Sequence, residues 1–476
     1  RARPAGRAGP RRPPTGRNGT LDRRTVILSA VILAVAPAGG TPLGAPPGGD
    51  RARGARGRAY TSNPTLRADR ARQRATDEQV PQALSGWRPT VGGQGSVAHS
   101  YTDTDVTHHS AANPKSLSIS LNQPLFRGYR TVKGTEAAEA AVEAGRQGLL
   151  ATEQSVLLQA VIAYMDVLRD RQIVSLRERN VTVLRGQLKA ANDRFSVGEV
   201  TRTDVSQARA SLSAAQSDVA AARASLGAST ANYYKIIGHN PGALTYPKPA
   251  PTPSSLPKAL AIANETNPNI LAAAMSQEVA EKTVDVIKGN LLPEVNLRAS
   301  AQNIYDPATG VDRRTDLQVA GVVDVPIYEG GMVYSQVRQA KQTASQRRIQ
   351  VIEATRAVRE GVTAAWNYLI AAGQGITAAR SQVSASGLAL DGVRQEYLVG
   401  SRTTLDVLNA EQAVLNARIA QVTAEHDKIV ASYQLLSAMG RLTAHHLSLN
   451  VPYYDPTENY RRVRNKWIGT DAETVE

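Results

Sequence analysis

The chain has 476 residues and a formal net charge of +15; it contains no cysteine, and aromatic residues make up only 4% of it. The lack of cysteine excludes disulfide bonds and the acylated N-terminal cysteine that lipoproteins carry. So few aromatic residues in an alanine-rich chain are typical of long helices packed along their length, and not of a globular domain with a thick core.

The positive charge is concentrated near the N-terminus. Residues 1–58 hold twelve arginines against Asp22 and Asp50, which leaves a net charge of +10 in this segment. The remaining chain shows no basic stripe with interleaved aromatic residues, and this argues against a nucleic-acid-binding protein. We interpret residues 1–22 as a basic disordered leader, or as the product of a start codon assigned too early.

Residues 23–38 have the pattern of a secretory signal peptide. Two arginines precede the apolar stretch Thr25 to Ala36, and Ala36-Pro37-Ala38 provides the small residues of a cleavage site. The apolar stretch is about 12 residues long, whereas a membrane-spanning helix needs about 20. We predict no transmembrane helix in the chain and expect residues 39–58 to be flexible.

The rest of the chain contains one unit twice. Pro124-Leu-Phe-Arg-Gly128 is matched 202 residues later by Pro326-Ile-Tyr-Glu-Gly330, and the segment 195–205 is matched by 397–407 at the same offset. Such matches in register indicate tandem repeats. We divide the chain into a first repeat (59–239), a proline-rich linker (240–257), a second repeat (258–445) and a C-terminal tail (446–476).

Both repeats show the same order of predicted elements. A short helical stretch begins after Asn63 and after Asn267, and two strands follow in which apolar residues alternate with a period of two. The strands are predicted near 91–97 and 117–123 in the first repeat and near 295–301 and 317–325 in the second, with loops at 102–115 and 306–315 between them. Pro124 and Pro326 are expected to end the second strands, because proline cannot donate to a strand ladder.

A long helical hairpin completes each repeat. Helical periodicity covers about 127–192 and about 330–395, and some 65 residues at 1.5 Å each form a rod of roughly 100 Å. The chain is expected to reverse at Val197-Gly198 and Val399-Gly400, where glycine can end a helix. The returning helices carry heptad repeats, which predict coiled-coil packing. The predicted seam of the first is Val205, Ala208, Leu212, Ala215, Val219, Ala222, Leu226, Ser229, Tyr233 and Ile236, and that of the second is Leu408, Leu415, Ile419, Val422, Ile429, Tyr433 and Leu436.

Four strands cannot close a barrel, and open strand edges are not tolerated in lipid. If this sheet enters a membrane, several copies of the chain must therefore combine their strands. Helical hairpins on the same axis would continue such a barrel as a tube.

The repeated motifs resemble those of TolC-type outer membrane factors, the outer membrane efflux protein family. The resemblance rests on the two Pro-x-x-x-Gly junctions given above and on the two Val-Gly-x-x-Thr-x-x-Asp-Val turns, and it covers about 58–445. It implies an α+β membrane protein: a trimer whose twelve-stranded β-barrel in the outer membrane continues into a periplasmic α-helical coiled-coil tunnel.

The resemblance also implies a function. It predicts the outer-membrane channel subunit of a tripartite export system, a passive duct that works with a periplasmic adaptor (membrane fusion) protein and an inner-membrane pump of the RND or ABC type. The exported substrates would be drugs or, in type I secretion, proteins. From a different class, a periplasmic coiled-coil adaptor or structural protein is the alternative, although an adaptor would have one hairpin and this chain has two.

By resemblance, the hairpin ends form the gate of the duct. Tyr397 and Arg402 would bond Asp204 and Thr203 of the first hairpin. The alternative is that Asp204 or Asp406 simply caps its helix, because Thr201-Arg-Thr-Asp204 and Thr403-Thr-Leu-Asp406 both fit capping boxes.

Three further sets of residues have a predicted role. The family's acidic constriction falls on Asp406 and Asn409 of this chain, so one acidic ring is expected in place of two. The turns at Val197, Gly198, Val399 and Gly400 are predicted to meet the adaptor, or to be plain helix ends. Phe126 and Tyr328, beside Pro124 and Pro326, mark the joints between barrel and helices, where packing at the neck and an interfacial aromatic belt are both open.

No enzyme or cofactor site is predicted. His108-His109 and His445-His446 are adjacent pairs without further ligands at suitable spacing, so we expect no metal site. The chain has no P-loop, nucleophile-elbow or zinc-protease motif, and energy for transport would have to come from a partner.

Overall fold

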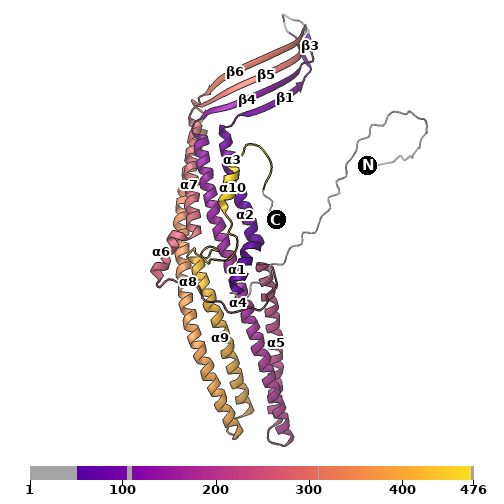
Figure 1. The fold of residues 1–476 in the computed structure, drawn as a ribbon, viewed down its shortest axis with the longest axis vertical. Helices are drawn as coiled ribbons and strands as arrows, with labels where there is room; N and C mark the ends of the chain where they lie inside the picture. The colour runs from indigo at the N-terminus through magenta and orange to yellow at the C-terminus, as the bar shows by residue number, and fades with distance from the viewer. Residues whose placement is uncertain (1–50, 104, 106–109, 309, 473–476) are drawn as a thin grey trace, which may run out of the picture. The chain divides into compact units, whose positions relative to one another are not determined.

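The computed structural model describes residues 51–472, apart from residues 104, 106–109 and 309 (Figure 1). The predicted leader, the signal peptide and His108-His109 lie outside the described residues. The first described element is helix α1 (Arg51–Ser62), in which Ala52 and Ala55 are buried. The prediction of a flexible segment is therefore wrong for residues 51–58, because small side chains on one face of α1 pack against other helices.

An antiparallel four-stranded sheet combines strands from both repeats in the order β1-β4-β5-β6. Its strands pair along most of their length and so form one continuous surface. Their bounds are Thr90–Val97 (β1), Lys115–Arg127 (β4), Glu294–Ala308 (β5) and Val311–Asp324 (β6).

The connections between these strands differ from the prediction. Strand β2 (Ser100–Thr102), which ends where the predicted loop 102–115 begins, pairs with β3 (Ser110–Ala112) inside that range. The predicted loop at 306–315 is wrong, since β5 and β6 run on to a tight turn at Gly310, whose φ is +81°.

The two prolines at the strand ends behave differently. Strand β4 passes through Pro124 by means of a register shift between Pro124 and Phe126, so this proline does not end the strand as predicted. Such a bulge accommodates the missing N–H. Strand β6 ends at Asp324, before Pro326, as predicted.

Short helices precede the first strand of each repeat, and in each repeat one of them begins directly after the predicted asparagine. The Oδ1 atoms of Asn63 and Asn267 accept hydrogen bonds of 2.9 Å from the backbone N–H groups of Thr65 and Asn269. These bonds satisfy donors that a helix start leaves free. The helices are α2 (Pro64–Asp77), α3 (Gln79–Leu84) and η1 (Ser85–Trp87) before β1, and α6 (Leu256–Thr266), α7 (Pro268–Lys288) and η2 (Gly289–Leu291) before β5.

A long helical hairpin follows the second main strand of each repeat, β4 in the first and β6 in the second. The first pairs α4 (Arg130–Ser196) with α5 (Arg202–Ile237), and the second pairs α8 (Met332–Leu398) with α9 (Thr404–Ala438). Both predicted heptad seams are confirmed, because every seam residue in both helices is buried or partly buried. Helix α9 packs against both α8 and α4, so α4 and α9 lie inside the row of long helices and α5 and α8 lie at its edges.

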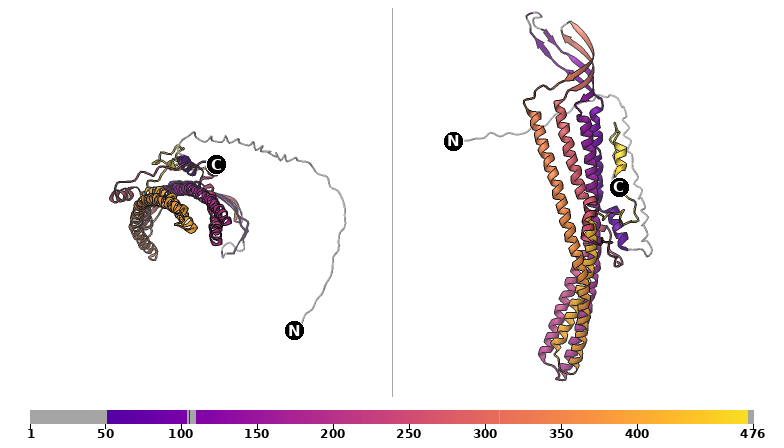
Figure 2. Two further views of the ribbon diagram at one scale, coloured as in Figure 1. Left: turned by 90° about the horizontal axis from the view of Figure 1, so that it is seen from below. Right: turned by 90° about the vertical axis from the view of Figure 1, so that its left-hand side faces the viewer.

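Within the described part of the chain, the long helices form a curved wall (Figure 2, left). Helices α1 and α10 (Pro456–Val463) lie on its convex side. The tail is held there by Asn459 of α10, whose Nδ2 donates to Asp77 of α2 over 2.8 Å.

The largest core cluster lies where the two hairpins, α1 and the linker meet. Tyr164 of α4 is 2% exposed, and its hydroxyl donates to the carbonyl of Thr245 over 2.8 Å. Leu435 and Leu436 of α9 belong to the same cluster. Among the described residues, α4 is the one helix whose length and composition would allow it to cross a membrane, but 56% of its most apolar 18-residue window is buried. Packing against neighbouring helices accounts for the apolar residues of that window.

Two glycines meet at the junction of sheet and helices. Gly128, just after β4, has φ +56°, and a Cβ atom built on it would lie 2.2 Å from the carbonyl oxygen of Gly289. Conversely, a Cβ atom on Gly289 would lie 2.4 Å from the carbonyl oxygen of Gly128. Neither position has room for a side chain, so the backbone of the first repeat touches that of the second here.

Candidate functional site

The two hairpins end in turns of the same form. Gly198 and Gly400 have φ values of +79° and +81°, a conformation that glycine adopts without strain. The preceding valines are open to solvent, with Val197 70% and Val399 80% exposed. Each turn thus presents an exposed apolar side chain at the end of its hairpin.

Capping boxes start both returning helices. The backbone N–H of Thr201 donates to Asp204 over 2.9 Å, and the N–H of Asp204 donates back to the Thr201 hydroxyl over 3.3 Å. Thr403 and Asp406 repeat this arrangement with distances of 2.9 and 3.2 Å. Both aspartates therefore act as helix caps, as the alternative interpretation predicted.

These hydrogen bonds keep both carboxylates ionised. The hydroxyl of Thr201, followed by its backbone N–H, lowers the pKa of Asp204. The backbone N–H of Thr403, followed by its hydroxyl, lowers the pKa of Asp406. Asn409, one turn further along α9, is exposed and carries no charge.

The bonds expected between the two hairpin ends are replaced by local ones in this chain. Arg402 donates from Nε to Glu396 over 2.6 Å, and the Tyr397 hydroxyl lies 3.3 Å from that of Thr404. Thr203 is exposed. Among the residues that the structure describes, no bond joins Arg402 to Asp204, because each is already engaged within its own hairpin.

A different contact joins the hairpin ends. The guanidinium group of Arg194, in the last turn of α4, lies over the ring of Tyr397 at 4.8 Å from its centroid. This cation–π pair links the last turns of α4 and α8. The sequence prediction missed Arg194, since nothing in its local pattern distinguishes it from the other exposed cations of α4.

Further from the ends, a buried histidine connects α9 to α4. The side chain of His426 is 9% exposed, and its Nε2 lies 3.0 Å from Asp166 of α4 while its Nδ1 lies 2.9 Å from Asp427. Only the doubly protonated imidazole donates from both nitrogens. Burial lowers the pKa of His426, but the hydrogen bonds to Asp166 and Asp427 outweigh it, and the net pKa is raised. The sequence prediction missed this histidine as well.

The predicted joint residues have different surroundings. Phe126 packs edge-on against Tyr129, with the ring centroids 5.2 Å apart. Pro124 is buried. Tyr328 is 79% exposed and its neighbour Ile327 94% exposed, so the packing expected at the second joint is not present within one chain.

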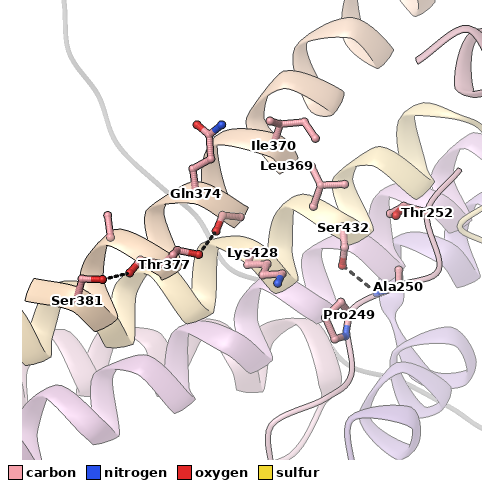
Figure 3. Close-up of a pocket in the computed structure, with 12 residues that line it drawn as sticks. Pro249, Ala250, Thr252, Leu369, Ile370, Gln374, Thr377, Ser381, Lys428 and Ser432 are labelled. Carbon is pink, nitrogen blue, oxygen red and sulfur yellow. Dashed lines mark hydrogen bonds between the residues drawn. The ribbon is translucent and has the colours of Figure 1, made fainter. Parts of the chain in front are cut away.

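A groove of about 790 Å³ lies between the linker, α8 and α9 (Figure 3). Its floor includes the bond from the backbone N–H of Ala250 to the Ser432 hydroxyl, 2.9 Å long. Lys428 is the one charged residue among those that line it. The groove holds no set of acid, base and nucleophile that could carry out a reaction.

Most of the chain matches known proteins. The family model described as "Outer membrane efflux protein" matches residues 56–239 and 259–441. The outer membrane efflux protein BepC of Brucella suis is 41% identical over 420 residues, which cover 87% of this chain and 91% of that protein. The outer membrane protein TolC of Escherichia coli is 28% identical over 412 residues, covering 81% of each. Among solved structures, the CmeC outer membrane channel of Campylobacter jejuni has the same fold, with a TM-score of 0.74 at 15% identity over 87% of this chain and 89% of that one.

Proposed function

This chain belongs to the outer membrane efflux protein family, and we propose that three copies of it form a passive export duct. The chain is an outer-membrane channel subunit, as its relatives are. The proposed assembly includes a trimer, a barrel, partner proteins and a gate. The barrel and the trimer rest on one observation: the sheet has an apolar face, a polar face and, within the described residues, two unpaired edge strands.

The two faces of the sheet differ sharply in chemistry. Leu117 and Ile119 of β4 share one face with Leu317 and Val319 of β6, and all four are 57–80% exposed. The serines and glutamines that alternate with them lie on the other face. Apolar residues outside and polar residues inside are the pattern of a transmembrane β-barrel.

The edges of the sheet indicate how the barrel closes. Within the described chain β1 and β6 each have one partner, and unpaired edges are not tolerated in lipid. We infer that β6 of one copy pairs with β1 of the next, so that three copies contribute twelve strands. Strands β4, β5 and β6 have 13, 15 and 14 residues, and about 9–11 tilted residues cross a bilayer.

The helices support the same assembly. Helices α5 and α8 are the outer members of the row, so α5 of one copy would meet α8 of the next and close the curved wall into a tunnel (Figure 2). An exposed apolar residue of α8 that lies level with α5, such as Leu388, would be covered by this contact. The groove of Figure 3 also borders α8 and would be covered in part.

Adjacent substitutions in β6 test the barrel. Leu317→Arg places a charge on the apolar face, which costs about 2–4 kcal/mol near the middle of a bilayer. Gln318→Arg places the same charge on the polar face. We expect Leu317→Arg to abolish trimers in the outer-membrane fraction and channel conductance in planar bilayers, and Gln318→Arg to retain both. Equal behaviour of the two variants would contradict the barrel.

We propose a periplasmic adaptor protein and an inner-membrane pump as partners, docked through the turns at Val197-Gly198 and Val399-Gly400. The chain lacks cysteine, so single cysteines at Val197 and Val399 report crosslinks without background. Crosslinks to an adaptor from these sites, and none from a cysteine at Ser225 on the exposed face of α5, are the expected result. The likeness to a relative named for efflux favours efflux, and co-purification of an RND or an ABC pump would decide between drug efflux and protein secretion.

For the gate, we propose two sets of contacts. Within a copy, Arg194 holds Tyr397. Between copies, Arg402 is placed to exchange Glu396 for Thr203 or Asp204 of a neighbour, because all of these groups reach solvent. Three ionised Asp406 carboxylates around the axis would attract cations, and the uncharged Asn409 adds no second ring.

A further inference from the structure

The segment after α10 forms a small closed loop with an apolar tip. Lys466 donates from Nζ to the carboxylate of Asp471 over 2.6 Å and to its carbonyl oxygen over 3.0 Å. Gly469 turns the chain with φ +113°. Between these points the loop exposes two consecutive apolar side chains, Trp467 at 64% and Ile468 at 91%.

The loop is tied to the base of the sheet. Arg88 donates from Nη1 to the carbonyl oxygen of Lys466 over 2.9 Å, and its guanidinium group lies over the Trp467 ring at 4.8 Å from the centroid. Arg88 stands two residues before the first residue of β1, Thr90. The apolar tip therefore lies level with the start of β1, as Figure 1 shows where the tail rises beside α3.

The tail before the loop is also fixed in place. Asn459 of α10 is 6% exposed and bonds Asp77, and Arg464 donates to Glu139 of α4 over 3.0 Å. Ordering such a segment costs conformational entropy that these contacts must offset. An ordered segment that exposes two consecutive apolar residues calls for a partner surface.

Charge and position indicate what that surface is. Arg464 is paired with Glu139, but Arg461 and Arg462, which precede the loop and bond Asp455 and Asn459, are exposed, and cations beside an apolar tip favour anionic phospholipid surfaces. Tryptophan is enriched where the polar headgroups meet the acyl chains. The loop follows α10, which lies on the convex side of the wall and thus faces away from the inside of the tunnel (Figure 2).

We propose that the loop 466–471 is a membrane anchor that inserts Trp467 and Ile468 into the periplasm-facing surface of the bilayer around the barrel. This rests on the proposed function, because a bilayer surrounds the start of β1 only if the sheet forms the barrel. The anchor adds a contact outside the barrel and fixes the depth at which each subunit sits.

Tryptophan fluorescence tests the anchor, because the chain has only three tryptophans, Trp87, Trp366 and Trp467. W87F/W366F leaves Trp467 as the reporter, and W87F/W467F leaves Trp366 as the control. Trp366 follows the start of α8 by 34 residues, and a helix of that length places it roughly 50 Å from the sheet. Both variants are reconstituted into phosphatidylcholine–phosphatidylglycerol vesicles, with or without bromine on the phosphatidylcholine acyl chains, and their conductance is recorded in the same preparation.

We expect brominated lipid to quench Trp467 and to leave Trp366 unchanged. Adding I468D or R88Q to the W87F/W366F variant should lower this quenching, the first by removing the apolar tip and the second by removing the tether. If the vesicles conduct and Trp467 is quenched by aqueous acrylamide but not by brominated lipid, the membrane anchor is contradicted. The proposed channel is not contradicted by that result. A Trp467 shielded from both quenchers is covered by a second copy and also overturns the anchor. Vesicles without conductance count against the channel itself and remove the basis for the anchor.

Discussion

Helices α4 and α8 occupy the same place in the two repeats and have the same length, 67 residues, yet they differ in burial. On α4, Val156 and Leu157 are at most 2% exposed. On α8, Ile349, Ile352 and Leu388 are 50–77% exposed. The difference arises because α4 is covered by α1, α2, α7 and α9, whereas α8 stands at the edge of the row. The first repeat can thus supply its long helix to the core of the chain, while the second repeat supplies the corresponding helix to a contact with another chain.

The largest difference between α4 and α8 is expected for the two aromatic residues that match at the offset of 202 residues. Tyr164 of α4 is buried, while Trp366 of α8 is only partly covered. Tyr164→Ala should lower the free energy of unfolding by about 3–5 kcal/mol, because it leaves a cavity and frees the polar groups of Thr245. Trp366→Ala should lower it by clearly less. Denaturant unfolding of the detergent-solubilised protein measures both, and equal losses would show that the two helices do not differ in burial.

The edge position of α8 can be tested at two neighbouring exposed residues. Ile352→Asn should weaken the trimer, since burial of one isoleucine contributes about 1.5–3 kcal/mol, and should leave the fold of the single chain unchanged. Glu353→Asn is the matched control and should assemble normally. The fraction of trimer at decreasing protein concentration gives the measurement. If Ile352→Asn forms trimers as tightly as Glu353→Asn, this part of α8 does not form a contact between chains.

The hairpin ends differ in their side chains, and conductance can show what the difference does. We expect Arg194→Ser and Arg402→Ser each to raise the resting conductance in planar bilayers several-fold, because each removes a contact that we assign to the closed state. Arg202→Ser removes an exposed arginine from the end of the first hairpin and should have no effect. An unchanged resting conductance in Arg402→Ser would count against the proposed gate contact of Arg402 with a neighbouring copy.

The contact between α9 and α4 should depend on pH. Because the pKa of His426 is raised in the fold, its contribution is fully present below the unfolded value of about 6.5 and is lost as the pH rises through the higher folded value. Arg169 and Asp170 of α4 and Tyr368 of α8 lie near the same cluster. Wild-type protein should therefore lose stability as the pH rises above about 6.5, and His426→Gln should lose less. Parallel pH profiles for the two proteins would rule out this role.

The smallest effects are expected where the two repeats agree. Thr201→Ala and Thr403→Ala each remove the N-cap of a returning helix and should each cost about 1 kcal/mol. The carboxylates of Asp204 and Asp406 have lowered pKa values, so their capping contribution is present above about pH 4 and is lost as the pH falls through the folded values. Melting temperatures of the two variants should match, and a large difference would mean that one cap has a second role.

Much of the fold could be predicted because it is local. The heptads, the capping boxes and the glycine turns depend on residues close in sequence, and Gly198 and Gly400 end their helices as expected. The neighbours of each hairpin could not be predicted in this way, because the contact of α9 with α4 has no local pattern. For the same reason Arg194 and His426 were missed. Helix α10 was missed because it is too short for a clear periodicity.

The glycine contact between Gly128 and Gly289 has a mechanical consequence. It fixes the two repeats against each other at the base of the sheet, while the hairpins extend from there without a break. The core cluster around Tyr164 ties the two hairpins together a second time, and the part of α4 beyond it, Tyr164 to Ser196, is roughly 50 Å long. A tilt of about 5° there moves the hairpin end by about 4 Å. In the duct that we propose, each hairpin end would thus be a lever that changes the width at the far end while the sheet hardly moves.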